Sequence, residues 1–180
     1  MFQITRDYLS KAHSGECCRM RLINYPAIPK ASTDTADEDI RAGEHTDYGS
    51  LTLLFRQPCD QGGLQVRQQG QWNDVPCLKD AVVVNIGDAL EFWTAGRLRS
   101  TIHRVAFPRS SNENVRRLSI PVFIQPDRDV TLAPLTGGTE SEDLQEGFTE
   151  VLKRKGYSSL TPMTSKDHLA ARVRATYIKA

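Results

Sequence analysis

Between His45 and Ile124 the sequence is a succession of short runs of β-forming residues with turn residues between them. GLQVRQ and QWNDVP flank Gln69-Gly70, a spacing typical of a β-hairpin. The run AVVVNIGD is continuously apolar, which predicts a strand buried on both faces. We interpret SLTLLF, ALEFWTAG, STIHRVAF and RLSIPVFIQP as further strands. Many short strands at close spacing predict a mainly β domain, either a sandwich or a barrel.

The two ends of the chain have a different pattern. Residues 1–17 predict a short helical segment, and residues 136–180 predict two helices. In the first of these helices the apolar residues share one face: Leu144, Phe148, Val151 and Leu152. Gly156 is a sensible end for that helix. Thr164 and Asp167 form a capping-box pattern at the start of the second helix, and we expect both helices to pack on the outside of the β domain.

Length and composition exclude several classes of protein. The 180 residues suffice for one domain with its own core, and a formal net charge of +1 argues against a nucleic-acid or anionic-membrane partner. The four cysteines have no CxxC spacing and no disulfide-like arrangement, which favours reduced thiols. No apolar run approaches the roughly 20 residues of a membrane span, and the N-terminus has no apolar signal core. We therefore expect a cytoplasmic protein.

The segment GEHTDYGSLTLLF contains a candidate metal site. His45 and Asp47 are two residues apart, so on an extended backbone both side chains point to the same face. Alone, this pair is also typical of a loop histidine that is hydrogen-bonded to an aspartate. His103 in STIHRVAF would add a third ligand and complete the facial triad of iron(II) oxygenases, which leaves positions open for co-substrate and dioxygen. Zinc lacks redox chemistry, and a zinc hydrolase would need a general base for which the sequence offers no clear candidate.

A second pair of polar residues lies in RLSIPVF. Arg117 and Ser119 share one face of the expected strand, while apolar residues take the other face. A buried arginine is costly unless an anion is bound beside it, and a guanidinium fits a carboxylate bidentately. The alternative is an exposed arginine at a strand edge. The nearby metal pattern favours an anion site.

The motifs together resemble a known family. RLINYP, HTDYGSLTLLF, GGLQV, QWNDVP, VVNIGDALEFWT, STIHRV and RLSIPVF occur in the order found in iron(II)- and 2-oxoglutarate-dependent dioxygenases of the isopenicillin N synthase-like group. The similarity covers roughly residues 18–126. It implies a double-stranded β-helix, or jelly-roll barrel, over residues 18–135, with residues 136–180 as helices that pack on it.

The same resemblance implies roles for individual residues. The implied iron ligands are His45, Asp47 and His103. The distal carboxylate of 2-oxoglutarate would be held by Arg117 and Ser119. The hydroxyl of Tyr25 is expected near the same carboxylate.

The implied activity is oxidation of an unactivated C–H bond of a small molecule. Iron(II), 2-oxoglutarate and O₂ are the implied cofactor and co-substrates, and succinate and CO₂ the products. A 2-oxoglutarate-independent oxidase of the same family is one alternative, and a catalytically silent barrel that acts as a binding module is another. Family members usually carry a substantial region before the segment that matches RLINYP. We therefore expect residues 1–17 to be a remnant of that region.

Overall fold

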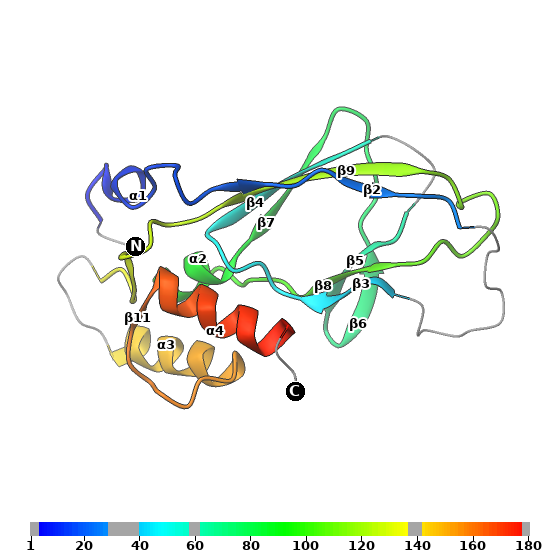
Figure 1. The fold of residues 1–180 in the computed structure, drawn as a ribbon. Coiled ribbons are helices and arrows are strands. Elements are labelled where there is room, and N and C mark those ends of the chain that lie inside the picture. Colours follow the sequence, from blue (N-terminus) through cyan, green and yellow to red (C-terminus); the bar gives the residue numbers. More distant parts are fainter. Residues whose placement is uncertain (1–3, 29–39, 58–61, 137–141, 178–180) are drawn as a thin grey trace.

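The computed structural model of the protein describes residues 4–28, 40–57, 62–136 and 142–177. Its strands form two antiparallel sheets and a two-stranded ribbon (Figure 1). The strands of sheet A are, in spatial order, β1 (Arg19–Met20), β9 (Arg117–Ile124), β4 (Leu51–Arg56) and β7 (Val82–Ile86), with β2 (Ile23–Tyr25) also paired to β9. The strands of sheet B are β3 (Ile40–His45), β8 (His103–Ala106), β5 (Leu64–Gln68) and β6 (Gln71–Asp74). The ribbon pairs β10 (Thr131–Leu132) with β11 (Met163–Thr164). The expectation of a mainly β chain is confirmed.

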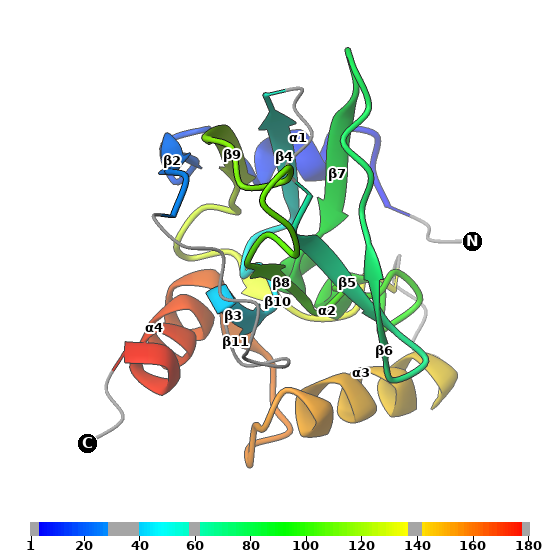
Figure 2. The same cartoon turned by 90° about the vertical axis from the view of Figure 1, so that its right-hand side faces the viewer.

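The helices lie outside the two sheets. They are α1 (Tyr8–Lys11), α2 (Asp88–Trp93), α3 (Glu142–Arg154) and α4 (Ser165–Tyr177). Helix α2 lies between sheet A and the two C-terminal helices, and Figure 2 shows α3 below it from a second direction. No helix in the described part of the chain combines the length and apolar character that a membrane span requires.

The largest cluster of buried apolar side chains surrounds α2 rather than the space between the sheets. Ala89, Phe92 and Trp93 have no exposed surface, and they pack with the apolar face expected for α3. The prediction of a strand for ALEFWTAG is therefore wrong. The three residues follow the i, i+3, i+4 spacing of one helical face, so a helix buries them together against α3.

The hairpin expected around Gln69-Gly70 is confirmed. Both turn residues have positive φ, 49° and 80°, as a two-residue turn between antiparallel strands requires. The prediction that AVVVNIGD is buried on both faces is wrong, because Val82 and Val84 of β7 are 42% and 59% exposed. Among the described strands, β7 pairs only with β4, so it forms an edge of sheet A.

The capping box of α4 is also confirmed. The backbone N–H of Asp167 donates to Thr164 Oγ1 at 3.1 Å, and the Thr164 hydroxyl donates to Asp167 Oδ2 at 2.7 Å. One face of α4 is turned toward the space between the sheets, where Leu169 and Val173 line a cavity. His168, on another face of α4, is 1% exposed.

Candidate active site

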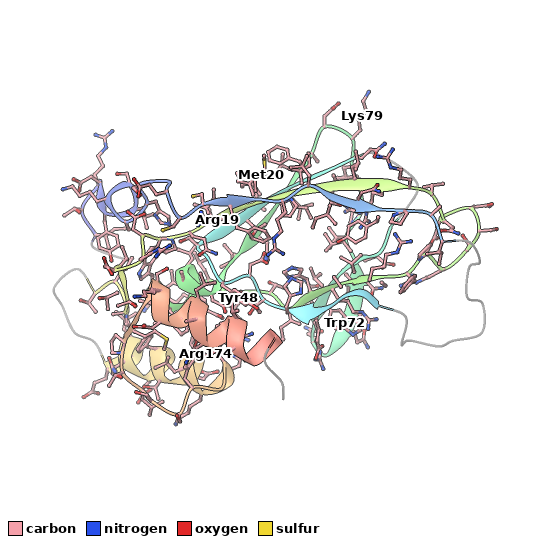
Figure 3. All side chains as sticks on the ribbon, in the orientation of Figure 1. Arg19, Met20, Tyr48, Trp72, Lys79 and Arg174 are labelled. Atoms are coloured by element: carbon pink, nitrogen blue, oxygen red, sulfur yellow. The ribbon has the colours of Figure 1, made fainter. Side chains whose placement is uncertain are left out.

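The two sheets enclose a cavity of about 960 Å³ that also reaches α4. All six residues for which the resemblance implied a role line it: Tyr25, His45, Asp47, His103, Arg117 and Ser119. Figure 3 shows side chains of both sheets projecting into the space between them. The labelled residues Arg19, on sheet A, and Tyr48, on the β3–β4 connection, lie on opposite sides of this space.

The three candidate metal ligands converge at one point of this cavity. His45 and His103 are paired directly across β3 and β8, and their ring centroids are 4.3 Å apart. Asp47 follows the end of β3, and its Oδ1 lies 3.9 Å from His45 Nε2 and 3.8 Å from His103 Nε2. One ligand atom from each residue lies within 4.8 Å of the other two. Asp47 lies in the connection that follows β3, two residues beyond the end of the strand, and this connection brings it to the two imidazoles.

The hydrogen bonds of the imidazoles suit metal binding. His45 Nδ1 lies 2.8 Å from the carbonyl oxygen of Gly43, and His103 Nδ1 lies 3.0 Å from that of Thr101. A carbonyl can only accept, so each Nδ1 carries the proton and each Nε2 presents its lone pair toward Asp47. Burial is the largest effect on the pKa of His103 and lowers it, although Asp47 acts in the opposite direction. Neutral imidazole is the form that binds a metal, so the three residues fit an iron(II) ion.

The carboxylate of Asp47 is oriented from both its side chain and its backbone. Asn85 on β7 donates its side-chain N–H to Asp47 Oδ2 at 2.8 Å, which leaves Oδ1 toward the histidines. The first N–H of α2, on Asp88, donates to the Asp47 carbonyl at 2.7 Å. A Cβ at Gly87 would lie 2.1 Å from the carbonyl oxygen of Gly49, so only glycine allows α2 to approach this turn so closely.

The candidate anion-binding residues lie on sheet A and face the same cavity. Arg117 and Ser119 are 2% and 5% exposed, whereas Leu118 between them is 37% exposed. The expected alternation along this strand is therefore confirmed. Tyr25 is paired with Arg117 across β2 and β9, and the guanidinium carbon lies 4.8 Å from the centre of the tyrosine ring. Burial raises the pKa of the Tyr25 hydroxyl, which keeps it protonated and able to donate.

Arg117 also reaches across the cavity. Its Nη1 donates to the carbonyl oxygen of Gly62, which lies just before the start of sheet B's strand β5. A guanidinium fits a carboxylate through paired N–H donors, so Arg117 is a candidate for binding an anion at this end of the cavity.

A buried network of charges lies behind the metal site, between α2 and the two C-terminal helices. Asp88 is fully buried and forms an ion pair with Lys155, just after α3, and its Oδ2 lies 3.2 Å from Nε2 of His168 on α4. Burial alone would raise the pKa of Asp88, but the hydrogen bonds and charges of His168 and Lys155 outweigh it and hold the pKa well below its usual range. His168 Nδ1 lies 2.7 Å from the Tyr157 hydroxyl. The network fixes α2, whose N-terminus holds the backbone of Asp47.

Two residues of the site could not be assigned from the motifs. Asn85 is the polar residue within the apolar run AVVVNIGD, and that interruption was the available signal. Arg56 is 8% exposed at the end of β4 and lines the cavity. Strand alternation from Thr52 could have placed it on the same face.

Comparison with known proteins agrees with this site. The model of the 2OG-Fe(II) oxygenase superfamily matches residues 16–126. The chain is 36% identical to 1-aminocyclopropane-1-carboxylate oxidase 3 of Arabidopsis thaliana over 148 residues, which are 81% of this chain and 42% of that protein. It is 35% identical to a proline hydroxylase of Petromyces alliaceus over 156 residues, 82% of this chain and 48% of that protein.

A solved structure is similar over nearly the whole chain. It is that of a full-length protein of Neurospora crassa in complex with alpha-KG, that is 2-oxoglutarate, and 5-formyluracil. The TM-score is 0.77 at 31% identity, covering 96% of this chain and 51% of that one. The chain thus spans about half the length of the proteins it matches.

Proposed function

This chain belongs to the 2OG-Fe(II) oxygenase superfamily, and we propose that it oxidises an unactivated C–H bond of a small molecule. The reaction would convert 2-oxoglutarate, O₂ and the substrate into succinate, CO₂ and hydroxylated substrate. The observation that carries the proposal is that a His-Asp-His cluster and a buried arginine–serine pair line one cavity. Each group alone fits several kinds of binding site, but together they match the two ends of a 2-oxo acid bound to iron.

We propose that His45, Asp47 and His103 hold the iron. Their ligand atoms converge, and the Nδ1 atoms of both histidines are occupied by backbone carbonyls. Asn85 would act as a positioning residue that keeps one carboxylate oxygen of Asp47 directed at the ion. Iron(II) with bound 2-oxoglutarate and O₂ supplies an oxidant strong enough to remove hydrogen from a C–H bond.

We propose that Arg117 and Ser119 bind the distal carboxylate of 2-oxoglutarate. The guanidinium supplies charge, and the hydroxyl of Ser119 supplies a further donor from the same strand face. Tyr25 is placed beside Arg117 by the pairing of β2 with β9, and its protonated hydroxyl could donate to the same carboxylate. These residues would orient the co-substrate so that its keto-acid end meets the iron.

The rest of the cavity would receive the organic substrate. Its lining combines the aromatic rings of Tyr48 and Phe123, the basic side chains of Arg19 and Arg21, and apolar Leu169 of α4. This mixture suits a small, flat molecule with polar substituents. The Neurospora crassa protein was solved with 5-formyluracil and with thymine, and it is similar over 96% of this chain in the first of these complexes. These two bases are therefore the first compounds to test.

For the domain arrangement we propose that residues 18–135 form the catalytic double-stranded β-helix. Sheets A and B would be its two halves, since both are antiparallel and both line the cavity. Residues 136–180 would be helices that pack on it. Within residues 1–17, Ala12 joins the core around Trp93, and His13 Nε2 lies 2.8 Å from Ser50 Oγ, so this segment packs on the domain as well.

The proposal is tested by measuring succinate in aerobic reactions of the purified chain with iron(II) and 2-oxoglutarate, with and without thymine. We expect succinate formation that depends on iron and that Asp47→Ala abolishes. Asp74→Ala is the matched control, because Asp74 is an exposed aspartate that forms an ion pair with Arg109. Absence of both succinate formation and 2-oxoglutarate binding by the iron-loaded protein would refute the proposal.

The same assay separates the two alternatives. A 2-oxoglutarate-independent oxidase would consume O₂ with substrate but release no succinate. A silent binding module would bind small molecules without turnover, and its iron content would be the same in Asp47→Ala and in the unaltered chain.

A further inference from the structure

Arg56 lies beside the anion-binding residues on the inner face of sheet A. It is the last residue of β4 and is paired with Ser119 of β9. Directly paired residues of neighbouring strands project from the same face of a sheet. Both residues line the cavity, and both are less than one-tenth exposed. Arg56 is therefore next to the hydroxyl that we propose for the distal carboxylate.

The guanidinium of Arg56 is only partly satisfied. Its Nη1 donates to the carbonyl oxygens of Val75 at 2.9 Å and Pro76 at 3.2 Å. Its Nε and Nη2 are buried and have no acceptor within the described ranges. In that part of the chain no carboxylate pairs with it. Leaving charged donors buried without an acceptor costs free energy, so the surroundings of Arg56 suit an anion that the described residues do not supply.

Arg56 and Arg117 make the same kind of contact with the backbone. Both start from sheet A, and each uses Nη1 to reach a backbone carbonyl of another segment, at Val75 and Gly62 respectively. Ser119 lies between them, because it is paired with Arg56 across β4 and β9 and is two residues from Arg117 along β9.

We propose that Arg56 is a second guanidinium of the co-substrate site, which binds the distal carboxylate of 2-oxoglutarate together with Arg117 and Ser119. This inference rests on the proposed function. Its consequence is selectivity: the chain should discriminate strongly between 2-oxoglutarate and a 2-oxo acid that lacks the distal carboxylate. The carbonyl contacts of Arg56 hold its side chain in place for this role.

The test compares the binding of 2-oxoglutarate and 2-oxobutyrate to the iron(II)-loaded chain by calorimetry without oxygen. 2-Oxobutyrate has the same keto-acid end and no distal carboxylate. We expect Arg56→Gln to weaken 2-oxoglutarate binding roughly 10-fold or more and to change 2-oxobutyrate binding less than about 2-fold, because only 2-oxoglutarate has a distal carboxylate to accept charge-assisted hydrogen bonds. Glutamine removes the charge but ends two bonds short of the arginine Nη1, so any effect of losing the Val75 and Pro76 contacts is judged from 2-oxobutyrate binding, which does not involve a distal carboxylate.

Two further variants complete the experiment. Arg56→Lys keeps the positive charge but lacks the paired N–H donors of a guanidinium. Its 2-oxoglutarate affinity should therefore lie between those of the unaltered chain and Arg56→Gln. Arg104→Gln is the matched control, since Arg104 contacts Gln65 and the Trp72 ring instead of lining the cavity. It should leave both affinities unchanged.

The outcomes separate this inference from the proposed function. If the unaltered chain binds both 2-oxo acids and Arg56→Gln changes neither affinity, or changes both equally, Arg56 only ties β4 to the Val75–Pro76 backbone and the inference is wrong. If the unaltered chain binds neither compound, the proposed function itself fails.

Discussion

In an ordinary half-buried sheet the buried face is apolar and the exposed face is polar, and in sheet A this polarity is reversed at several positions. Its inner face carries buried polar side chains of β4 and β9: Thr52, Arg56, Arg117 and Ser119. Its outer face carries exposed apolar residues. One row of paired residues on that face runs across four strands: Val84, Leu53, Val122 and Met20. Val84 and Met20 in this row are 59% and 63% exposed.

This contrast agrees with the proposal that the polar groups of the inner face bind ligands, since a purely structural core would bury apolar groups there. On the outer face the paired apolar residues form an exposed row. Neighbouring residues of one strand can therefore be exchanged to test the two faces separately.

The greatest difference should be between Arg117 and Leu118. Arg117→Met should weaken 2-oxoglutarate binding by roughly 100-fold or more, because it removes a buried charge from the carboxylate site. Leu118→Gln, on the outer face, should change that affinity less than about 2-fold. Calorimetric titration of both iron-loaded variants measures the difference. Equal effects would mean that the inner face has no special role.

Asn85 and Val84 form the next pair. Asn85→Ala should lower iron affinity by roughly 10-fold to 100-fold, because the carboxylate of Asp47 loses its positioning hydrogen bond. Val84→Ser removes an exposed apolar side chain and should leave iron affinity as it is. Competition with a metal-sensitive dye gives both affinities. An unaffected Asn85→Ala variant would remove Asn85 from the metal site.

The charges behind α2 provide a comparison between two buried groups whose pKa values are lowered for different reasons. Burial lowers the pKa of His168, so the unfolded chain takes up a proton first as the pH falls below about 6.5. Stability should therefore decrease from about pH 7 to about pH 5. It should decrease again below about pH 4, where the unfolded carboxyl of Asp88 becomes protonated while the folded one stays ionised until its own, lower pKa.

Denaturant unfolding of the metal-free chain at a series of pH values measures this dependence. His103, whose pKa is also lowered, contributes in the same range, so the informative quantity is the difference between the unaltered chain and His168→Gln. That difference should shrink as the pH falls from about 7 to about 5. A difference that does not vary with pH would mean that His168 is not buried in its neutral form.

The weakest effect concerns the outer face alone. Met20→Lys and Val84→Lys should leave 2-oxoglutarate affinity within about 2-fold, because both side chains are exposed on the face opposite Arg117 and Ser119. Calorimetric titration of both iron-loaded variants measures this affinity. If both variants lost 2-oxoglutarate binding, the two faces would not be independent.

The sequence was most informative where residues of one proposed role also follow the spacing of a single strand. Arg117 and Ser119 follow strand alternation, so their common face could be predicted from spacing. His45, Asp47 and His103 could be grouped by the chemistry of their side chains and by the resemblance. Strand alternation alone would not have placed Asp47, because it lies in the connection after the end of β3.

Other features depend on contacts that spacing does not encode. ALEFWTAG is apolar enough for either a strand or a helix, and only the packing of Phe92 and Trp93 against α3 decides for a helix. From its position in the sequence, His168 could be a surface residue of an amphipathic helix. In the structure it is buried because Asp88 and Tyr157, from other parts of the chain, contact it. Arg56 could be placed on a strand face, but its neighbour Ser119 is far along the chain and is known only from the register of β4 with β9.

A joint site for iron and 2-oxoglutarate is tested most sharply by an oxygen-free titration of the unaltered chain with 2-oxoglutarate, once with iron(II) bound and once without metal. We expect one saturable site per chain, with clearly tighter binding in the presence of iron, because the keto-acid end binds the ion while the distal carboxylate binds sheet A. Absence of binding to the iron-loaded chain would contradict such a site, as would binding of equal strength with and without the metal.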